Sequence, residues 1–346
     1  MPDRSSGPGG GQPPRSPLGI NWGRVLTLLG LGLLVALALL RLAGGREALR
    51  AILAVSPGAL GAMLAVFYLS ILLRIWRWQV LLEAVGHRVG LWPLGRLLFT
   101  GYFLNTVVPA RAGDVARILL LGRWHRVPLE TATGSMVVER ALDVIVILTG
   151  AATAAFVVLP ELVPPAVVQV YVAALLLMVA AGVALLAAPR LEGRLLGLWS
   201  NARYQAALRA GFSFLRAMRG MAADKGRLAL ALAQTAGVWA GEVTVAGLVM
   251  GALGIHLPVG RLIFMILTVD LVGAIPLLPG GLGQVEAVYL SLLLLLGASR
   301  SSAGVTILLH RAITFWSIML VGGAITLLGG TLRSAGAAAR EGEVHE

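Results

Sequence analysis

The sequence predicts an all-α, polytopic integral membrane protein. Hydrophobic residues make up 58% of its 346 residues and charged residues only 13%, which is far from the average of soluble proteins. Several apolar runs reach about 20 residues, the length that a helix needs to cross a hydrocarbon core. A transmembrane barrel would instead show short segments of alternating hydrophobicity. The composition therefore favours a bundle of membrane-spanning helices.

The apolar runs predict about six full spans, with two re-entrant hairpins between them. We expect the spans at 20–43, 57–84, 129–159, 165–188, 227–252 and 303–331. Together, residues 20–332 should form one transmembrane domain, with halves at roughly 20–160 and 165–332. The Gly/Pro-rich segment 1–19 is expected to be a disordered cytoplasmic tail, and 333–346 a second cytoplasmic tail.

Basic residues predict how the chain is oriented. The net charge is +12, and the connector 190–227 carries eight Lys/Arg against two acids together with several aromatic residues. This is typical of an interfacial amphipathic segment that contacts anionic lipid on the cytoplasmic side. Both termini are then cytoplasmic, in a multi-pass protein of the bacterial inner membrane. Because basic residues gather at the ends of apolar segments, nucleic acid is not an expected partner.

Two stretches do not read as simple spans. In 92–122 an apolar run breaks at Pro109 and resumes as a short charged helix, and in 258–297 a run breaks at PLLPGGLG. Proline and glycine weaken the backbone hydrogen bonding of a helix, and such breaks at membrane depth persist only inside protein or beside water. Each stretch is therefore predicted to be a re-entrant helical hairpin.

The two broken stretches also resemble each other. GRLLF at 95–99 matches GRLIF at 260–264, and 131–143 aligns with 302–314 at one constant offset. Three predicted spans separate the hairpins, so they should enter from opposite membrane faces. Such an inverted repeat is typical of transporters whose substrate site lies near the midplane.

The first hairpin supplies four candidate substrate-binding residues. Arg111 and Arg117 could hold a phosphate through forked donors, and the helix that begins near Gly113 offers free N–H groups to an anion. Asn105 and Asp114 complete the set. The alternative is a solvated loop at the membrane interface, with Asp114 favouring the first turn of a helix.

Within the third span, VVERALDVIVIL places Glu139, Arg140 and Asp143 at depth. Glu139 and Asp143 are four residues apart and share one helix face. Buried charges are costly in a membrane and face partners or a polar cavity. We predict that Arg140 is a counter-ion for Asp114 or for a lipid phosphate, the alternative being a purely structural network.

The second hairpin provides the remaining candidates. Glycines permit positive φ and a close backbone approach, so the tip ahead of Glu286 could form a concavity that accepts an anion. His310 on its own is more typical of a packed histidine than of a proton relay. The predicted set from this half is Glu242, Asp270, Gly280, Gly281, Gly283, Glu286, His310 and Arg311.

Motifs of enzymes are missing from the sequence. There is no HExxH, GxSxG or P-loop motif and no Cys/His zinc spacing, and the chain has no cysteine. Its five histidines are scattered. We therefore expect neither a metal nor a cofactor, while the oligomeric state stays open.

The motifs N-x3-P-x3-GD-x2-R at 105–117, ER-x2-D at 139–143 and P-x2-PGGLG-x2-E at 276–286 occur in this order. In this the chain resembles the lysylphosphatidylglycerol synthase transmembrane region family, the flippase-like domain of the bacterial multiple peptide resistance factor. The likeness runs from about residue 20 to 332. It implies an integral membrane domain that moves an aminoacylated phospholipid between leaflets. Because the chain ends soon after the last span, lysyl transfer is not expected.

Three functions follow from these observations. The leading hypothesis is a translocase for a phospholipid or a polyprenyl-linked glycolipid, whose headgroup passes through a polar groove between the hairpins. The first alternative is a membrane-embedded, lipid-modifying transferase or its accessory subunit, with Glu139, Asp143 or Glu286 as the base. The second is a non-catalytic partner in envelope assembly. The inverted repeat favours the translocase.

Overall fold

The computed structural model describes residues 22–108, 111–158, 161, 163–187, 192, 202–275 and 279–328, and the regular elements within these residues are all helices. This confirms the predicted all-α class. Five helices in this part of the chain are long and apolar enough to cross a membrane. They are α3 (Pro57–Glu83), α6 (Leu129–Val158), α7 (Pro165–Ala187), α10 (Lys225–Ala252) and the continuous helix made of α13 (Arg300–Arg311), η3 (Ala312–Trp316) and α14 (Ser317–Leu328).

The predicted first span corresponds to α1 (Trp22–Leu42), in which Gly30–Leu42 counts as a shorter apolar helix. The six predicted spans are thus represented by five long apolar helices and α1. The structure adds α2 (Arg46–Leu53), which the sequence did not predict. Leu49, Ile52 and Leu53 share one face of this helix, but its eight residues are fewer than the 11–18 over which a helical period is read.

Both predicted hairpins are present. The first consists of α4 (Leu91–Val107) and α5 (Ala112–His125). The second consists of α11 (Val259–Gly273), the short 3-10 turn η2 (Pro279–Gly281) and α12 (Gln284–Leu295). The predicted breaks at Pro109 and Pro276 lie outside the described residues.

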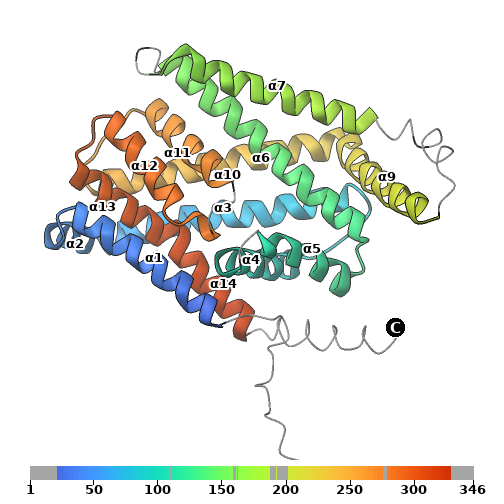
Figure 1. Ribbon diagram of the computed structural model, residues 1–346, viewed down its shortest axis with the longest axis horizontal. Helices are drawn as coiled ribbons and strands as arrows, with labels where there is room; N and C mark the ends of the chain where they lie inside the picture. The colour runs from blue at the N-terminus through green and yellow to red at the C-terminus, as the bar shows by residue number, and fades with distance from the viewer. Residues whose placement is uncertain are drawn as a thin grey trace, which may run out of the picture.

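Helices α3 and α10 form the centre of the molecule (Figure 1). Ser70 of α3 lies against Gly241 of α10, whereas Arg77, further along α3, bonds to Thr235, which comes earlier in α10. The two helices are therefore antiparallel. Small residues at the crossing let the backbones approach, as in other membrane helix pairs.

Each hairpin helix in one half of the chain packs on the long span of a half in the same way as its counterpart in the other half. Helix α4 packs on α14, and its counterpart α11 packs on α6; α5 packs on α6, and α12 packs on α13. The first hairpin reaches in from the end of the bundle where α9 (Ala202–Ala223) lies, and the second from the end where α2 lies (Figure 1). The fold thus has the antiparallel arrangement of an inverted repeat.

Helix α9 covers most of the described part of the basic connector. Phe212, Met218 and Met221 are buried, and α9 packs on α6, while Arg209 and Arg219 are exposed on the opposite side. The helix is therefore amphipathic, as predicted. The remaining connector positions 190, 191 and 193–201 lie outside the described residues.

The first hairpin depends on two glycines that bring its helices into contact. A Cβ atom at Gly113 would lie 1.9 Å from the carbonyl oxygen of Gly101. A Cβ atom at Gly101 would lie 2.4 Å from Cδ of Arg117. These two positions therefore leave room for the arginine stem between α4 and α5.

We expect Gly113→Ala to destabilise the protein, because the added methyl group forces the hairpin helices apart at a cost of about 1–3 kcal/mol. Thermal unfolding in detergent, followed by tryptophan fluorescence, measures this. Gly61→Ala is the matched control, since a Cβ at that position in α3 meets nothing within 4 Å. Equal melting temperatures for the two variants would contradict the close packing of the hairpin.

The arrangement also predicts the membrane sides of α2 and α9. The chain has no cysteine, so a single introduced thiol can be labelled selectively. We expect Glu47→Cys in α2 and Arg219→Cys in α9, both exposed positions, to react from opposite sides of intact cells or oriented vesicles, with Arg219→Cys on the cytoplasmic side. Labelling of both thiols from one side would contradict the inverted arrangement.

Candidate functional site

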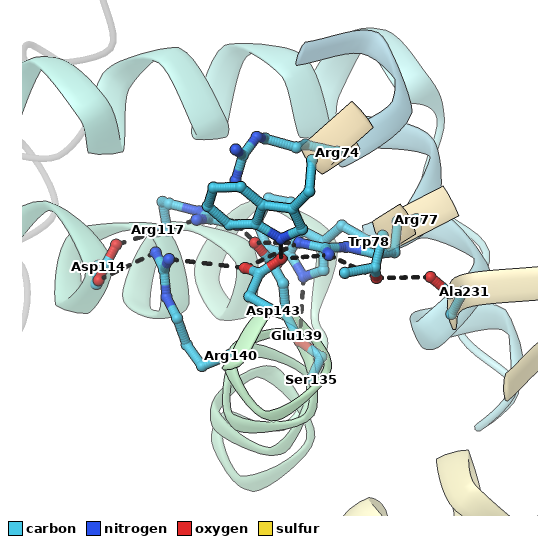
Figure 2. A network of polar contacts seen from close by, with 12 residues as sticks. Arg74, Arg77, Trp78, Asp114, Arg117, Ser135, Glu139, Arg140, Asp143 and Ala231 are labelled. Carbon is cyan, nitrogen blue, oxygen red and sulfur yellow. Dashed lines mark hydrogen bonds and ion pairs between the residues drawn. The ribbon is translucent and has the colours of Figure 1, made fainter. Parts of the chain in front are cut away.

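A network of charged side chains lies inside the bundle between α3, α5 and α6. We call it the buried ion network, and Figure 2 shows its members, Arg77, Asp114, Arg117, Glu139, Arg140 and Asp143. Arg77 is its centre: its guanidinium lies 3.3 Å from Glu139 and 2.7 Å from Asp143. Arg77 also donates to the Thr235 hydroxyl at 2.8 Å, which ties the network to α10.

Arg117 lies deep in this network. Its side chain is fully buried, and its guanidinium is 3.4 Å from Glu139 and stacks 4.3 Å from the ring centre of Trp78. The Trp78 indole N–H in turn donates to the Ser135 hydroxyl at 3.0 Å. In this conformation Arg117 supports the acids from within and does not reach a surface that a headgroup could touch.

Asp114 is held from several directions at the first turn of α5. The Asn105 amide donates to its carboxylate at 3.0 Å, and the Asp114 backbone N–H donates back to the Asn105 side chain at 3.3 Å. Arg140 lies 3.5 Å from the carboxylate and Arg111 3.9 Å. The predicted pairing of Arg140 with Asp114 is therefore present.

Two arginines form the accessible edge of the site. The side chains of Arg111 and Arg140 are 33% and 35% exposed, whereas the other members of the buried ion network reach at most 11%. Arg111 has a left-handed backbone, with φ of 53°, a conformation that costs a non-glycine residue about 1–2 kcal/mol. It donates to the Ala274 carbonyl at 2.5 Å. Since Ala274 ends α11, this bond joins the tips of the two hairpins.

A second ion pair connects α3 with α10. Arg74 lies 3.2 Å from Glu242, and its guanidinium faces the ring of Trp239 at 5.1 Å. The Trp239 indole N–H donates to Asp143 at 3.2 Å. The predicted residues Glu242 and Asp143 therefore belong to one continuous polar system.

The second half repeats one of these pairs. Glu286, in the first turn of α12, accepts from Arg311 at 2.6 Å and from the Gly283 backbone N–H at 2.7 Å. Arg311 also donates to the Gly280 carbonyl at 3.3 Å and stacks over Phe315 at 4.2 Å. The pair Glu286–Arg311 occupies the place that Asp114–Arg140 has in the first half.

The predicted glycine conformations are confirmed, and the π-helical turn that follows Arg311 was not foreseen. Gly280, Gly281 and Gly283 have φ values of 62°, 65° and 80°. The π-helical turn η3 interrupts the last span; such turns are frequent at functional sites.

Two predicted residues stand apart from these ion pairs. Asp270 has no arginine or lysine within 4 Å among the residues that the structure describes. His310 is buried, and its ring packs edge-on against Tyr289 at 5.4 Å. The remaining predicted residues belong either to the ion pairs and hydrogen bonds described above or to the glycine turn ahead of Glu286.

Sequence reasoning missed Arg74, Arg77 and Trp78. All three lie in the stretch RIWRW of α3, at 74–78, inside an apolar span. Two arginines at that depth are themselves a signal, since charged residues within a span face the bundle interior and pair there. The surplus of acids predicted in the other helices also required such partners.

Comparison with known proteins identifies the family. The model of the lysylphosphatidylglycerol synthase TM region family matches residues 26–322, so the chain belongs to this family, whose description links it to lipid handling. The chain is 26% identical over 263 residues to a UPF0104 membrane protein of Methanothermobacter thermautotrophicus, covering 71% of this chain and 78% of that protein. It is 25% identical over 225 residues to a UPF0104 membrane protein of Methanocaldococcus jannaschii, covering 64% and 91%.

We expect Arg77→Met to lower the free energy of unfolding by about 3–5 kcal/mol, because Glu139 and Asp143 would remain buried without their shared counter-ion. Arg216→Met is the control, since Arg216 pairs with Glu192 at the surface and surface pairs contribute about 1 kcal/mol or less. Equilibrium unfolding in mixed micelles measures both variants. A loss at Arg77 no larger than at Arg216 would show that the buried ion network does not stabilise the fold.

Proposed function

We propose that this member of the lysylphosphatidylglycerol synthase TM region family moves a lipid with a phosphate-bearing headgroup between the two leaflets. The headgroup passes along the contact between the hairpin tips while the acyl chains stay in the bilayer. The observation that carries the proposal is the accessible edge formed by Arg111 and Arg140, two guanidinium groups at the junction of the two re-entrant hairpins.

The charge balance at this edge favours an anion. Four arginines, Arg77, Arg111, Arg117 and Arg140, surround three carboxylates, Asp114, Glu139 and Asp143. This group of side chains therefore has one excess positive charge. Among its four arginines only Arg111 and Arg140 are partly exposed, so a ligand would meet the excess charge at these two. A phosphodiester has one negative charge and accepts forked hydrogen bonds from guanidinium groups.

The acids around these arginines orient them. Asp114 lies between Arg111 and Arg140 and is itself held by Asn105, and Arg140 also approaches Asp143 at 3.9 Å. Since the guanidinium groups are positioned before a ligand arrives, binding costs less conformational entropy. Arg140 Nε is buried and has no hydrogen-bond partner within the described structure, so the accessible donors of this side chain are its terminal nitrogens, which face Asp114 and Asp143.

The junction of the hairpins supports movement as well as binding. The first hairpin enters from one end of the bundle and the second from the other, and Arg111 bonds to Ala274 where they meet (Figure 1). A headgroup phosphate that replaces the Ala274 carbonyl as the partner of Arg111 would separate the tips. Binding would thereby open a path from one side to the other, as in transporters with inverted repeats.

The proposal is tested by reconstituting purified protein in vesicles with labelled lipids. The lipids compared are phosphatidylglycerol, phosphatidylethanolamine and a polyprenyl-phosphate-linked sugar, which separate the two sources of the phosphate. We expect protein-dependent exchange between leaflets for at least one of them. Unchanged leaflet accessibility for all three, with folded protein, would contradict the proposal. Chemical conversion of the lipid would support a transferase instead.

Arg111→Gln and Arg140→Gln are each expected to slow the movement of that lipid roughly tenfold, the effect of losing one charge-assisted hydrogen bond of about 1.5 kcal/mol. Thermal stability is recorded in parallel, because both arginines also hold Asp114 and an unfolded variant would slow lipid movement as well. Arg209→Gln, at an exposed position of α9, is the matched control for lost positive charge. Wild-type rates in both edge variants would exclude these arginines from headgroup binding.

A further inference from the structure

Asp270 differs from the other acids inside the helical bundle. Asp114, Glu139, Asp143, Glu242 and Glu286 each have an arginine within 4 Å. For Asp270, the described residues contain neither such an arginine nor a hydrogen-bond donor to its side chain, and the residue is partly exposed. An unpaired carboxylate at this depth is costly, so it either takes up a proton or serves a ligand.

The unpaired state of Asp270 results from a difference between the halves. Asp270 lies ten residues after Gly260, and Asn105 lies ten residues after Gly95 in the matching hairpin. The Asn105 amide bonds to Asp114. In the second half the corresponding acid, Glu286, accepts from Arg311 and from the Gly283 N–H, which leaves Asp270 without this partner.

Two further polar groups beside this hairpin also lack partners. Tyr289 lies three residues after Glu286, as Arg117 lies three after Asp114, and His310 precedes Arg311, as Glu139 precedes Arg140. The first half has the ion pair Arg117–Glu139 at these positions, whereas the second half has the neutral rings of Tyr289 and His310. The Tyr289 hydroxyl and His310 Nε2 are buried and have no hydrogen-bond partner in the described part of the chain. They add two hydrogen-bonding groups without partners to the surroundings of Asp270.

The charged groups that act on Asp270 come from each helix packed around it. Glu242 of α10 and Asp143 of α6 repel its charge, whereas Arg74 of α3 and Arg311 of α13 attract it, and neither arginine lies within 4 Å. The Tyr289 hydroxyl of α12 lies close enough to Asp270 for the charge of the carboxylate to act on it electrostatically. His310 lies against Tyr289. The attraction and the repulsion thus come from two arginines and two acids.

Counting charges over both halves connects Asp270 to the arginine edge. The charged residues of the ion pairs in both halves, taken together with Asp270, are six arginines and six acids. They are Arg74, Arg77, Arg111, Arg117, Arg140 and Arg311, and Asp114, Glu139, Asp143, Glu242, Asp270 and Glu286. Their charges sum to zero when Asp270 is ionised. A bound phosphodiester adds one negative charge. A proton on Asp270 restores neutrality, and charge imbalance is expensive in a medium of low dielectric constant.

We propose that Asp270 is a proton-binding site, and that its protonation is coupled to headgroup binding at Arg111 and Arg140, so that the protein carries one proton together with each anionic lipid. The two sites are adjacent, because Arg111 bonds to Ala274, one helical turn beyond Asp270. Each ligand raises the affinity for the other by the same factor, as linkage requires. This coupling rests on the proposed function; the proton site itself does not.

A proton is the ligand that a single carboxylate can hold by itself, and the described residues contain no group of three His, Cys, Asp or Glu side chains that would favour a metal ion instead. Hard cations require about six oxygen ligands. A proton needs one carboxylate and a route to water, and the surrounding helices cover Asp270 only in part. The proton enters from one aqueous side, neutralises the carboxylate and leaves on the other side after the hairpins have moved.

The first experiment measures the proton site without lipid movement. Infrared spectra of purified protein, recorded over a pH series in H2O and D2O, are expected to show a protonated-carboxyl band that titrates in the wild type and is lost in Asp270→Asn. Tyr289→Phe should shift the midpoint of this titration. Glu47→Gln, which removes an exposed acid of α2, should leave the band unchanged. An identical band in Asp270→Asn and the wild type would overturn the proton site.

The second experiment measures coupling in reconstituted vesicles with the lipid that the protein moves. A pH gradient is expected to change the wild-type rate at least threefold, a sodium gradient to have no effect, and Asp270→Asn to lose the response to pH while keeping its thermal stability. A wild-type response to sodium alone, or an intact pH response in Asp270→Asn, would overturn the coupling. If the wild type moves no lipid, the proposed function and the coupling fail, and the infrared result alone decides the proton site.

Discussion

The double ion pair of Arg77 with Glu139 and Asp143 is the interaction on which the rest of the structure depends. Arg77 is fully buried, and in such surroundings each charge requires a close partner of opposite sign. Glu139 in turn holds Arg117, and Asp143 receives the Trp239 indole N–H from α10. One guanidinium thus fixes the relative positions of α3, α6 and α10, and through Arg117 it also fixes the re-entrant helix α5.

This dependence explains which parts of the structure were predictable. Both hairpins follow from local chemistry, since proline and glycine breaks in apolar sequence restrict the backbone whatever surrounds them. Their antiparallel placement follows from the number of spans between them. The short helix α2 carries no comparable signal. The partners of the acids could not be assigned, because Arg77 reaches Glu139 across more than 60 sequence positions, and only packing sets such distances. Burial of Arg117 likewise depends on Gly101 in the neighbouring helix.

The two halves share a backbone arrangement but differ in chemistry. In the first half, ion pairs hold the hairpin to α6 through Arg117 and Glu139. In the second half, the rings of Tyr289 and His310 take that place, and η3 interrupts the helix directly after Arg311. Breaking a buried ion pair costs about 3–5 kcal/mol. Two ion pairs, Asp114–Arg140 and Arg117–Glu139, hold the first hairpin to α6, whereas one, Glu286–Arg311, holds the second hairpin to α13.

In the proposed transport cycle, this asymmetry would give the two hairpins different roles. The first hairpin would carry the anion-binding edge, and the second would carry Asp270 on the half that fewer ion pairs hold in place. Arg111 joins them through a single bond to Ala274. Under the two proposals, a lipid phosphate would compete with that carbonyl for Arg111, and a proton on Asp270 would remove the charge that otherwise holds the second hairpin near the arginines. Because both events would weaken the same junction, the hairpins would separate most readily with lipid and proton bound together, which is the condition for coupled movement.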